Sequence, residues 1–118
     1  MENLIVDIET NGLLDTVSKV HCIVTKGETI TVATTHKEIE EILETLSKSH
    51  IIGHNILGFD LEVLKRLYNF EVPLDQVTDT LILSRLIYPD IRQEDSILKR
   101  LEPKFWGSHS LRAWGHRL

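Results

Sequence analysis

Two acidic residues, Asp7 and Glu9, stand at the end of an apolar stretch near the start of the chain. Side chains alternate along a strand, so these two carboxylates point to the same side of the predicted strand. Neighbouring carboxylates disfavour each other's ionisation, and a bound divalent cation removes that conflict. A metal site is therefore one of two interpretations of the pair. The alternative interpretation is that a strand ends near solvent and its last residues are polar for that reason.

A second group of candidate residues lies between Gly53 and Asp60, where a predicted strand ends, a glycine-bearing loop follows and a helix begins. Asp is a preferred N-cap residue, so helix capping is the ordinary interpretation of Asp60. Capping does not account for Asn55 and Phe59, which precede Asp60 at fixed spacing. Asp79 looks similar, and it is interpreted as a cap on the helix that follows it.

Hydrophobic periodicity predicts the elements that must position these residues. The nearly continuous apolar run at 3–9 predicts a central strand covered on both faces. Thr35 and Glu38 form a capping-box pattern, which opens the clearest predicted helix. The other predicted elements are a hairpin of strands 20–25 and 28–34, short strands at 50–53 and 77–79, and helices from about residue 60, over 81–87 and over 110–116. This order indicates a mixed sheet with helices packed on it.

The composition predicts one globular domain. The chain has 118 residues, of which 42% are hydrophobic and 26% are charged. Its formal net charge of −5 argues against a protein that coats duplex nucleic acid by itself. No basic leader and no membrane-length apolar run is visible, and Cys22 is the only cysteine. We therefore expect a protein of the reducing cytoplasm that has no disulfide and no membrane partner.

The chain resembles the DEDD superfamily of 3′–5′ exonucleases, and within it the proofreading domain of T7-like phage DNA polymerases of family A. The resembling segments, in the order of that family, are 7–14, 19–22, 53–60, 79–87 and 107–115. Asp-x-Glu alone is a weak signal, whereas the ordered set of segments is specific. The similarity runs from end to end of the chain.

The resemblance implies a two-metal hydrolytic mechanism. Asp7, Glu9 and Asp60 would be both metal ligands and catalytic residues, and they would hold two Mg²⁺ or Mn²⁺ ions at the terminal phosphodiester. The implied substrate-binding residues are Thr10, Asn11, Leu13 and Asn55. Among these, the backbone near Thr10 and Asn11 would approach the terminal nucleotide, Leu13 would pack against its base, and Asn55 would mainly shape the second motif.

The resemblance also implies the architecture and the partners. The expected fold is a single α/β domain over 1–118, with an RNase H-like mixed sheet of antiparallel opening strands and then parallel strands, helices on both faces, and a missing C-terminal part. The expected partner is the single-stranded 3′ end of DNA. A polymerase or a second chain is a further expected partner, and the bacterial host cytoplasm is the expected location if a phage encodes the chain.

One part of the family pattern is absent. The third motif places a Tyr, or a His in another branch of the family, shortly before a fourth metal-binding Asp. Neither Tyr68 nor Tyr88 is followed by Asp at that spacing, and the last Asp of the chain is Asp95. We therefore expect the chain to be incomplete or inactive alone, as a fragment, a split protein or a truncated gene product. Two alternatives stay open. One is a non-catalytic RNase H-like module that binds a nucleic-acid end or a replication partner, and the other is a related ribonuclease.

Basic and aromatic residues alternate near the end of the sequence. Lys99, Arg100, Lys104 and Arg112 are interleaved with Phe105 and two tryptophans. This pattern has two interpretations, which are a nucleic-acid contact and a solvated basic face over aromatic core residues.

Overall fold

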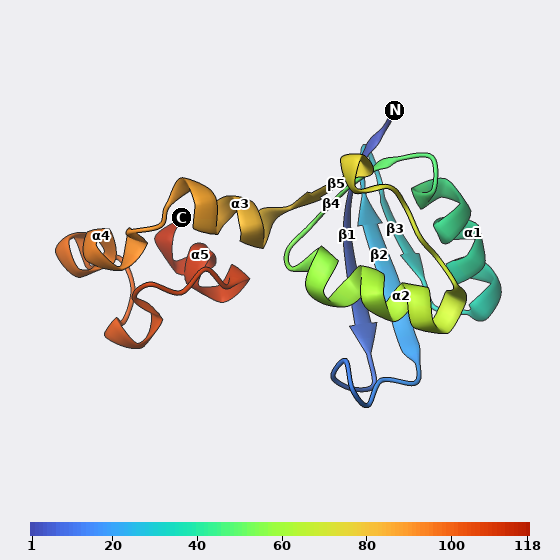
Figure 1. The fold of residues 1–118 in the computed structure, drawn as a ribbon, viewed down its shortest axis with the longest axis horizontal. Helices are drawn as coiled ribbons and strands as arrows, with labels where there is room; N and C mark the ends of the chain where they lie inside the picture. The colour runs from blue at the N-terminus through green and yellow to red at the C-terminus, as the bar shows by residue number, and fades with distance from the viewer. The chain divides into compact units, whose positions relative to one another are not determined.

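The computed structural model describes all 118 residues, Met1–Leu118. The chain forms two compact units, each with its own packing. Residues Met1–Asp79 make up the first, which we call the sheet unit, and Thr80–Leu118 make up the second, which we call the helical unit. Figure 1 labels the elements of both units in chain order. None of the helices is both long enough and apolar enough to cross a membrane.

The sheet unit is built on a five-stranded mixed sheet. Its strands are β1 (Asn3–Thr10), β2 (Val20–Lys26), β3 (Ile30–Ala33), β4 (His50–Gly53) and β5 (Val77–Asp79). They lie in the order β3-β2-β1-β4-β5, with β1 in the centre. The β1–β2 and β2–β3 pairs are antiparallel, whereas β1–β4 and β4–β5 are parallel. The predicted hairpin and the predicted change from antiparallel to parallel pairing are confirmed, and the fold is an α/β fold of RNase H-like type.

Two helices complete the sheet unit. They are α1 (His36–Leu46) and α2 (Leu61–Tyr68), and shorter turns at η1 (Ile56–Asp60, π-helical) and η2 (Leu74–Gln76, 3₁₀) precede α2 and β5. The predicted capping box is confirmed, because the Thr35 hydroxyl accepts the Glu38 N–H at 3.2 Å and the Glu38 carboxylate accepts the Thr35 N–H at 3.0 Å. This cap fixes where α1 begins.

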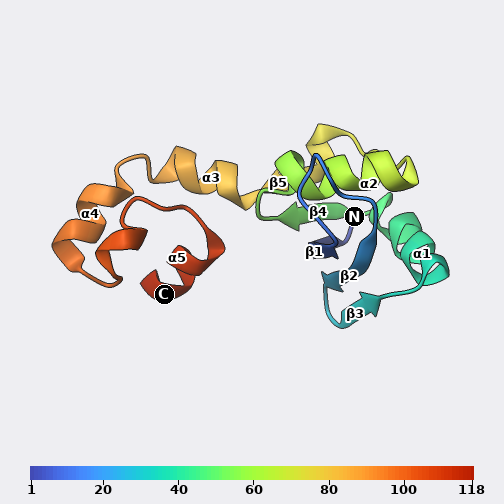
Figure 2. The ribbon, with the colours of Figure 1, turned by 90° about the horizontal axis from the view of Figure 1, so that it is seen from below.

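Both helices pack against one face of the sheet. Leu4, Val6 and Ile8 alternate along β1 toward that face, and they share one core with the buried residues of α1 and α2. Figure 2 shows the two helices on the same side of the sheet. The other face of β1 carries Ile5, which is 53% exposed. The expectation that both faces of β1 are covered is therefore wrong within the sheet unit, because α1 and α2 cover only one face of the sheet.

The helical unit contains three short helices and a 3₁₀ turn. They are α3 (Thr80–Ile87), α4 (Ile91–Leu98), η3 (Pro103–Phe105) and α5 (Leu111–Arg117). The predicted helices over 81–87 and 110–116 are confirmed, and Ser110 caps α5 by accepting the Ala113 N–H at 3.1 Å. Ala113 is fully buried in that helix, whereas Leu111 is 63% exposed.

A buried ion pair is at the centre of the helical unit. The Arg117 guanidinium donates from Nε to Asp95 Oδ1 at 2.9 Å and from Nη2 to Asp95 Oδ2 at 2.6 Å. The Gly107 N–H also donates to Asp95 Oδ2 at 3.0 Å, and the guanidinium carbon lies 4.8 Å from the Trp114 ring centroid. The hydrogen bonds from Arg117 are the main reason that the pKa of Asp95 is lowered. This pair joins α4 to α5.

Candidate active site

Asp7 and Glu9 both lie on the exposed face of β1, because Val6 and Ile8 alternate with them into the core. The prediction that these two carboxylates share one side of the strand is therefore confirmed. Their antiparallel neighbours on β2 are Val24 and Cys22 respectively. The register shifts between Glu9 and Thr10, at the end of the strand, so the ladder becomes irregular next to the acidic pair.

Asp60 lies at the end of the π-helical turn that leads into α2, and its side chain is only 6% exposed. Its backbone is already helical, with φ −54° and ψ −50°, and its side chain makes no capping hydrogen bond. The capping interpretation of Asp60 is therefore wrong. A buried Asp that does not cap a helix needs another explanation, since burying an ionised carboxylate is unfavourable unless it is compensated. π-Helical turns of this kind are frequent at functional sites.

The pKa of Asp60 is raised to about 7. Burial is the largest cause, and the negative charge of Asp7 is the second. A hydrogen bond from the Ile8 backbone N–H favours the ionised form and offsets part of this rise. These interactions place the Asp60 carboxyl group at β1, next to Asp7. The structure thus brings together Asp7 and Asp60, which are 53 positions apart in the sequence.

Close approach of the backbone holds the turn against the sheet. A Cβ atom on Gly53 would lie 2.7 Å from Ile56 Cδ1 and 3.1 Å from the Val6 carbonyl oxygen. Only glycine therefore fits at the end of β4. Asn55 has a left-handed backbone with φ 55°, and its carbonyl oxygen accepts the Phe59 N–H at 3.1 Å. Asn55 thus shapes the turn before α2 through its backbone.

The sequence interpretation of Asp79 missed its contacts across the sheet. Its carboxylate accepts the Asn55 N–H at 2.9 Å and the Leu57 N–H at 3.0 Å. Asp79 is 6% exposed and ends β5, directly opposite Gly53 in the parallel ladder. The sequence shows only that Asp79 ends a predicted strand. It does not show which residues the carboxylate contacts.

The loop after β1 contains the other predicted substrate-binding residues. The Thr10 hydroxyl donates to the Gly12 carbonyl oxygen at 2.8 Å, and Asn11 Oδ1 accepts the N–H groups of Ser18 and Lys19, each at 3.0 Å. These side chains therefore stabilise the loop itself. Leu13 projects from the same loop and is 75% exposed. The expected approach of this loop to a nucleotide stays a prediction.

The carboxylates of Asp7, Glu9 and Asp60 are the kind of ligand that a hard cation prefers. The structure does not bring all three of them together at one point. Mg²⁺ and Mn²⁺ prefer carboxylate oxygens, and a cation would relieve the repulsion between Asp7 and Asp60. No group of three or more His, Cys, Asp or Glu side chains lies close enough together to hold a metal ion. Glu9 is on the correct face of β1, but it is not among the groups that shift the pKa of Asp60.

Formal charge is divided unequally between the two units. The sheet unit has six Lys and Arg residues and fourteen Asp and Glu residues, which gives −8, whereas the helical unit has seven and four, which gives +3. In the helical unit, three basic side chains surround Phe105. Lys104 Nζ, Arg112 Cζ and the His116 ring centroid each lie 5.1 Å from its ring centroid. The acidic candidate site and this basic cluster thus belong to different units.

Comparison with known proteins adds sequence relatives. No family model matches the chain. The chain is 33% identical over 131 residues to the DNA-directed DNA polymerase of Escherichia phage T7, and 34% identical over 131 residues to that of Enterobacteria phage T3. Each alignment covers 98% of this chain and 19% of the relative, so the chain spans about a fifth of the length of these polymerases. This similarity supports a polymerase-related domain.

Proposed function

We propose that the sheet unit carries the first two carboxylate motifs of a metal-dependent 3′–5′ exonuclease that acts on the single-stranded 3′ end of DNA. The observation that supports this most strongly is the buried Asp60, which makes no capping bond and has a pKa of about 7 beside Asp7. Strongly shifted pKa values with a specific charged neighbour are typical of functional sites. The similarity to two phage DNA polymerases supports DNA as the substrate.

We assign the roles of these residues from the resemblance to the exonuclease family. Asp7, Glu9 and Asp60 would hold Mg²⁺ or Mn²⁺ at the end of β1. Bound in this way, a pair of such ions supplies a more acidic water and stabilises the negative charge on the leaving 3′ oxygen. The sheet fixes Asp7 and Glu9, and the turn before α2 fixes Asp60. Exposed Leu13, on the loop that follows β1, would pack against the terminal base.

The chain has no Tyr-x-x-x-Asp pattern, so these 118 residues do not supply the fourth carboxylate of the resembling family. We propose that residues of a polymerase or of a second chain contribute it. The three carboxylates of the sheet unit would then bind metal weakly, and hydrolysis by the 118 residues alone would be slow or absent, because a missing ligand lowers the occupancy of the second ion.

Metal-dependent stability tests the site assignment. Mn²⁺ at ten times its dissociation constant should raise the free energy of unfolding by about 1.4 kcal/mol through mass action. Asp7→Asn and Asp60→Asn should each remove most of this increase. Asp15→Asn changes the same charge at an exposed loop position and is the matched control, which should respond to Mn²⁺ as the unmodified chain does. An equal response of all four proteins would exclude the site.

A nuclease assay tests the reaction. DNA and RNA oligonucleotides labelled at the 5′ end distinguish stepwise shortening from the 3′ end from internal cleavage, and they distinguish the two substrates. We expect at most slow, Mn²⁺-dependent shortening of single-stranded DNA that Glu9→Gln removes. Rapid hydrolysis that Asp7→Asn abolishes would show that another group of this chain replaces the fourth carboxylate. Faster shortening of RNA than of DNA would favour a ribonuclease.

A second candidate function is a nucleic-acid-binding module without catalysis, and the basic cluster around Phe105 favours it. Arg112→Ala should weaken binding of single-stranded DNA in the presence of a metal chelator, and it should reduce the slope of log affinity against log salt by about 0.7. Lys37→Ala removes one exposed positive charge from α1 and is the control. Binding that requires Mn²⁺ and is insensitive to Arg112→Ala would contradict this function.

A further inference from the structure

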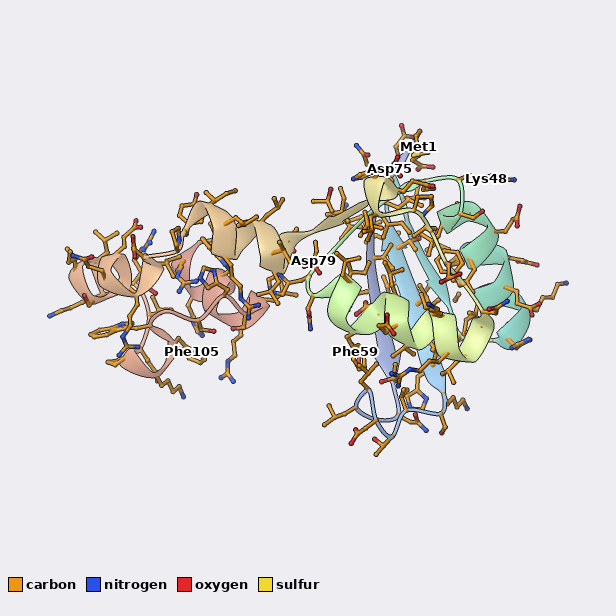
Figure 3. The ribbon with its side chains drawn as sticks, viewed as in Figure 1. Met1, Lys48, Phe59, Asp75, Asp79 and Phe105 are labelled. Atoms are coloured by element: carbon orange, nitrogen blue, oxygen red, sulfur yellow. The ribbon has the colours of Figure 1, made fainter.

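Asp79 connects the end of β5 to the turn that carries Asp60. In the parallel ladder, Asp79 lies opposite Gly53, the residue where β4 ends and the chain leaves the sheet. From this place, Asp79 Oδ1 accepts the Asn55 N–H at 2.9 Å and Oδ2 accepts the Leu57 N–H at 3.0 Å. Figure 3 labels Asp79 beside the loop that leads into α2. Both carboxylate oxygens therefore contact the backbone of this loop.

Asp79 accepts two backbone N–H groups that need a hydrogen-bond acceptor from outside their own turn. The first N–H groups of a helix have no intrahelical acceptor, and Leu57 lies in the first turn of the π-helical segment. Asn55 lies two residues beyond the end of β4, so its N–H is outside the ladder of the sheet. Hydrogen bonds to an ionised carboxylate are among the stronger ones in proteins. Asp79 thus fixes the turn at two points two residues apart.

Asp60 follows Leu57 by three residues within the same π-helical segment. The segment is packed closely as well, because its first residue, Ile56, is fully buried against Gly53. We propose that Asp79 is a positioning residue, whose carboxylate clamps the turn at Asn55 and Leu57 and thereby places the Asp60 carboxyl group beside Asp7. This role rests on the proposed function. It differs from metal ligation, because both oxygens of Asp79 are directed at backbone N–H groups.

Asp79→Asn tests the clamp with little change in shape. The amide keeps one acceptor oxygen and replaces the other with a donor, which cannot accept an N–H. Hydrogen exchange followed by NMR should show that the Asn55 or Leu57 amide exchanges at least about tenfold faster, as the loss of a hydrogen bond to a charged group implies. The Ile8 amide, which donates to Asp60, should also lose protection, whereas the core amide of Ile23 should change less than about twofold.

Asp75→Asn is the matched control, because Asp75 is an exposed carboxylate just before β5. The amide exchange rates and the Mn²⁺ affinity of Asp75→Asn should equal those of the unmodified chain. Mn²⁺ affinity, measured by electron paramagnetic resonance, should fall about tenfold in Asp79→Asn, although Asp7, Glu9 and Asp60 are all retained. Asp79→Glu, which keeps the charge, should recover part of this loss.

Unchanged Ile8 exchange in Asp79→Asn would overturn the proposal, because Asp60 would then keep its place without the clamp. A uniform loss of protection that includes Ile23 would overturn it too, since Asp79 would then stabilise the whole unit rather than the turn. Failure of the unmodified chain to bind Mn²⁺ would contradict the proposed function. The Ile8 amide would still decide whether Asp79 positions Asp60, so the two failures are distinguishable.

Discussion

The negative charge of Asp7 acts directly on the buried carboxyl group of Asp60 and is, after burial itself, the largest reason that the pKa of Asp60 rises to about 7. The two residues come from the central strand and from the turn before α2. Their proximity is unfavourable for folding when both are ionised. Under the proposed function, a bound divalent cation would offset this repulsion, so metal binding would raise the stability of the sheet unit.

The first prediction concerns the dependence of stability on pH. The folded-state pKa of Asp60, about 7, is above the usual aspartate pKa of 3.8. The folded state therefore binds this proton more tightly, and the resulting stabilisation is complete below pH 4 and is lost as the pH rises to about 7. The loss is on the order of 4 kcal/mol. Asp60→Asn should remove this decline, so urea unfolding followed by circular dichroism should find the variant more stable at pH 8.

Asp15→Asn is the control for this measurement, because Asp15 is exposed and lies outside the site. It should retain the pH dependence of the unmodified chain. If Asp60→Asn and Asp15→Asn lose stability equally between pH 5 and pH 8, then Asp60 titrates in the normal range and is not held beside Asp7.

The second prediction concerns the close contact at the end of β4. Gly53→Ala would place a Cβ atom 2.7 Å from Ile56 Cδ1 and 3.1 Å from the Val6 carbonyl oxygen. Overpacking of this kind destabilises proteins by about 1–3 kcal/mol. We expect that loss in urea unfolding, together with weaker Mn²⁺ binding. Gly115→Ala is the matched substitution, because nothing lies within 4 Å of its added Cβ and Ala favours a helix. A similar loss for both variants would contradict the packing argument.

The third prediction concerns the buried ion pair of the helical unit. Asp95→Asn leaves the Arg117 guanidinium buried without its counter-charge, which should destabilise this unit by about 3–5 kcal/mol. Both tryptophans of the chain are in the helical unit, so tryptophan fluorescence reports its unfolding separately. The double variant Asp95→Leu/Arg117→Met should be much less destabilised than Asp95→Asn, because it leaves no unpaired charge. Equal losses for the two proteins would show that shape, not charge, dominates.

The same pair sets a second pH dependence, of opposite sign. The pKa of Asp95 is lowered in the folded state, mainly by hydrogen bonds from Arg117. Its stabilisation is therefore complete above the usual aspartate pKa of 3.8 and is lost as the pH falls further. Tryptophan fluorescence should show the helical unit unfolding in acid below about pH 4, with no decline between pH 5 and pH 8 from this residue. A midpoint that Asp95→Asn leaves unchanged would exclude the pair as the cause.

The fourth prediction concerns the start of α1. Thr35→Ala removes the hydroxyl that accepts the Glu38 N–H, and it should destabilise the sheet unit by about 1 kcal/mol. Glu38→Gln keeps an acceptor for the Thr34 and Thr35 N–H groups, so its loss should be smaller. The midpoint of urea unfolding measures both. A larger loss for Glu38→Gln would show that the charge of Glu38, rather than the Thr35 hydroxyl, is the main stabilising part of the cap.

Local signals in the sequence predicted the parts of the fold that depend on local chemistry. The Thr35–Glu38 capping box, the strand β1 and the hairpin of β2 and β3 each involve residues that are close to one another in the sequence. The pairing of Asp7 and Glu9 on one face also followed, because side-chain alternation is a property of any strand.

Contacts between distant residues were not predictable in this way. The continuous apolar run of β1 suggested burial on both faces, but Ile5 faces away from the helices that cover the sheet. Asp79 is interpreted from the sequence as a cap because it directly precedes a predicted helix. Its contacts with the Asn55 and Leu57 N–H groups were missed, since these lie more than twenty positions earlier. Asp95 and Arg117 are 22 positions apart, and no periodicity connects them. Each of these contacts depends on the tertiary fold, which brings residues together that are far apart in the sequence.

The π-helical turn has a consequence for helical phase. Val63 and Leu64 follow Asp60 by three and four positions, and both are fully buried in the core. Asp60 therefore continues the inward stripe of α2, so the same rotation about the helix axis that packs α2 also directs the carboxyl group inward. Deleting a single residue between Asp60 and Val63 would turn the helix by about 100° relative to Asp60. The chain would then have to expose either the carboxyl group or the apolar stripe, so insertions and deletions in this segment act on both at once.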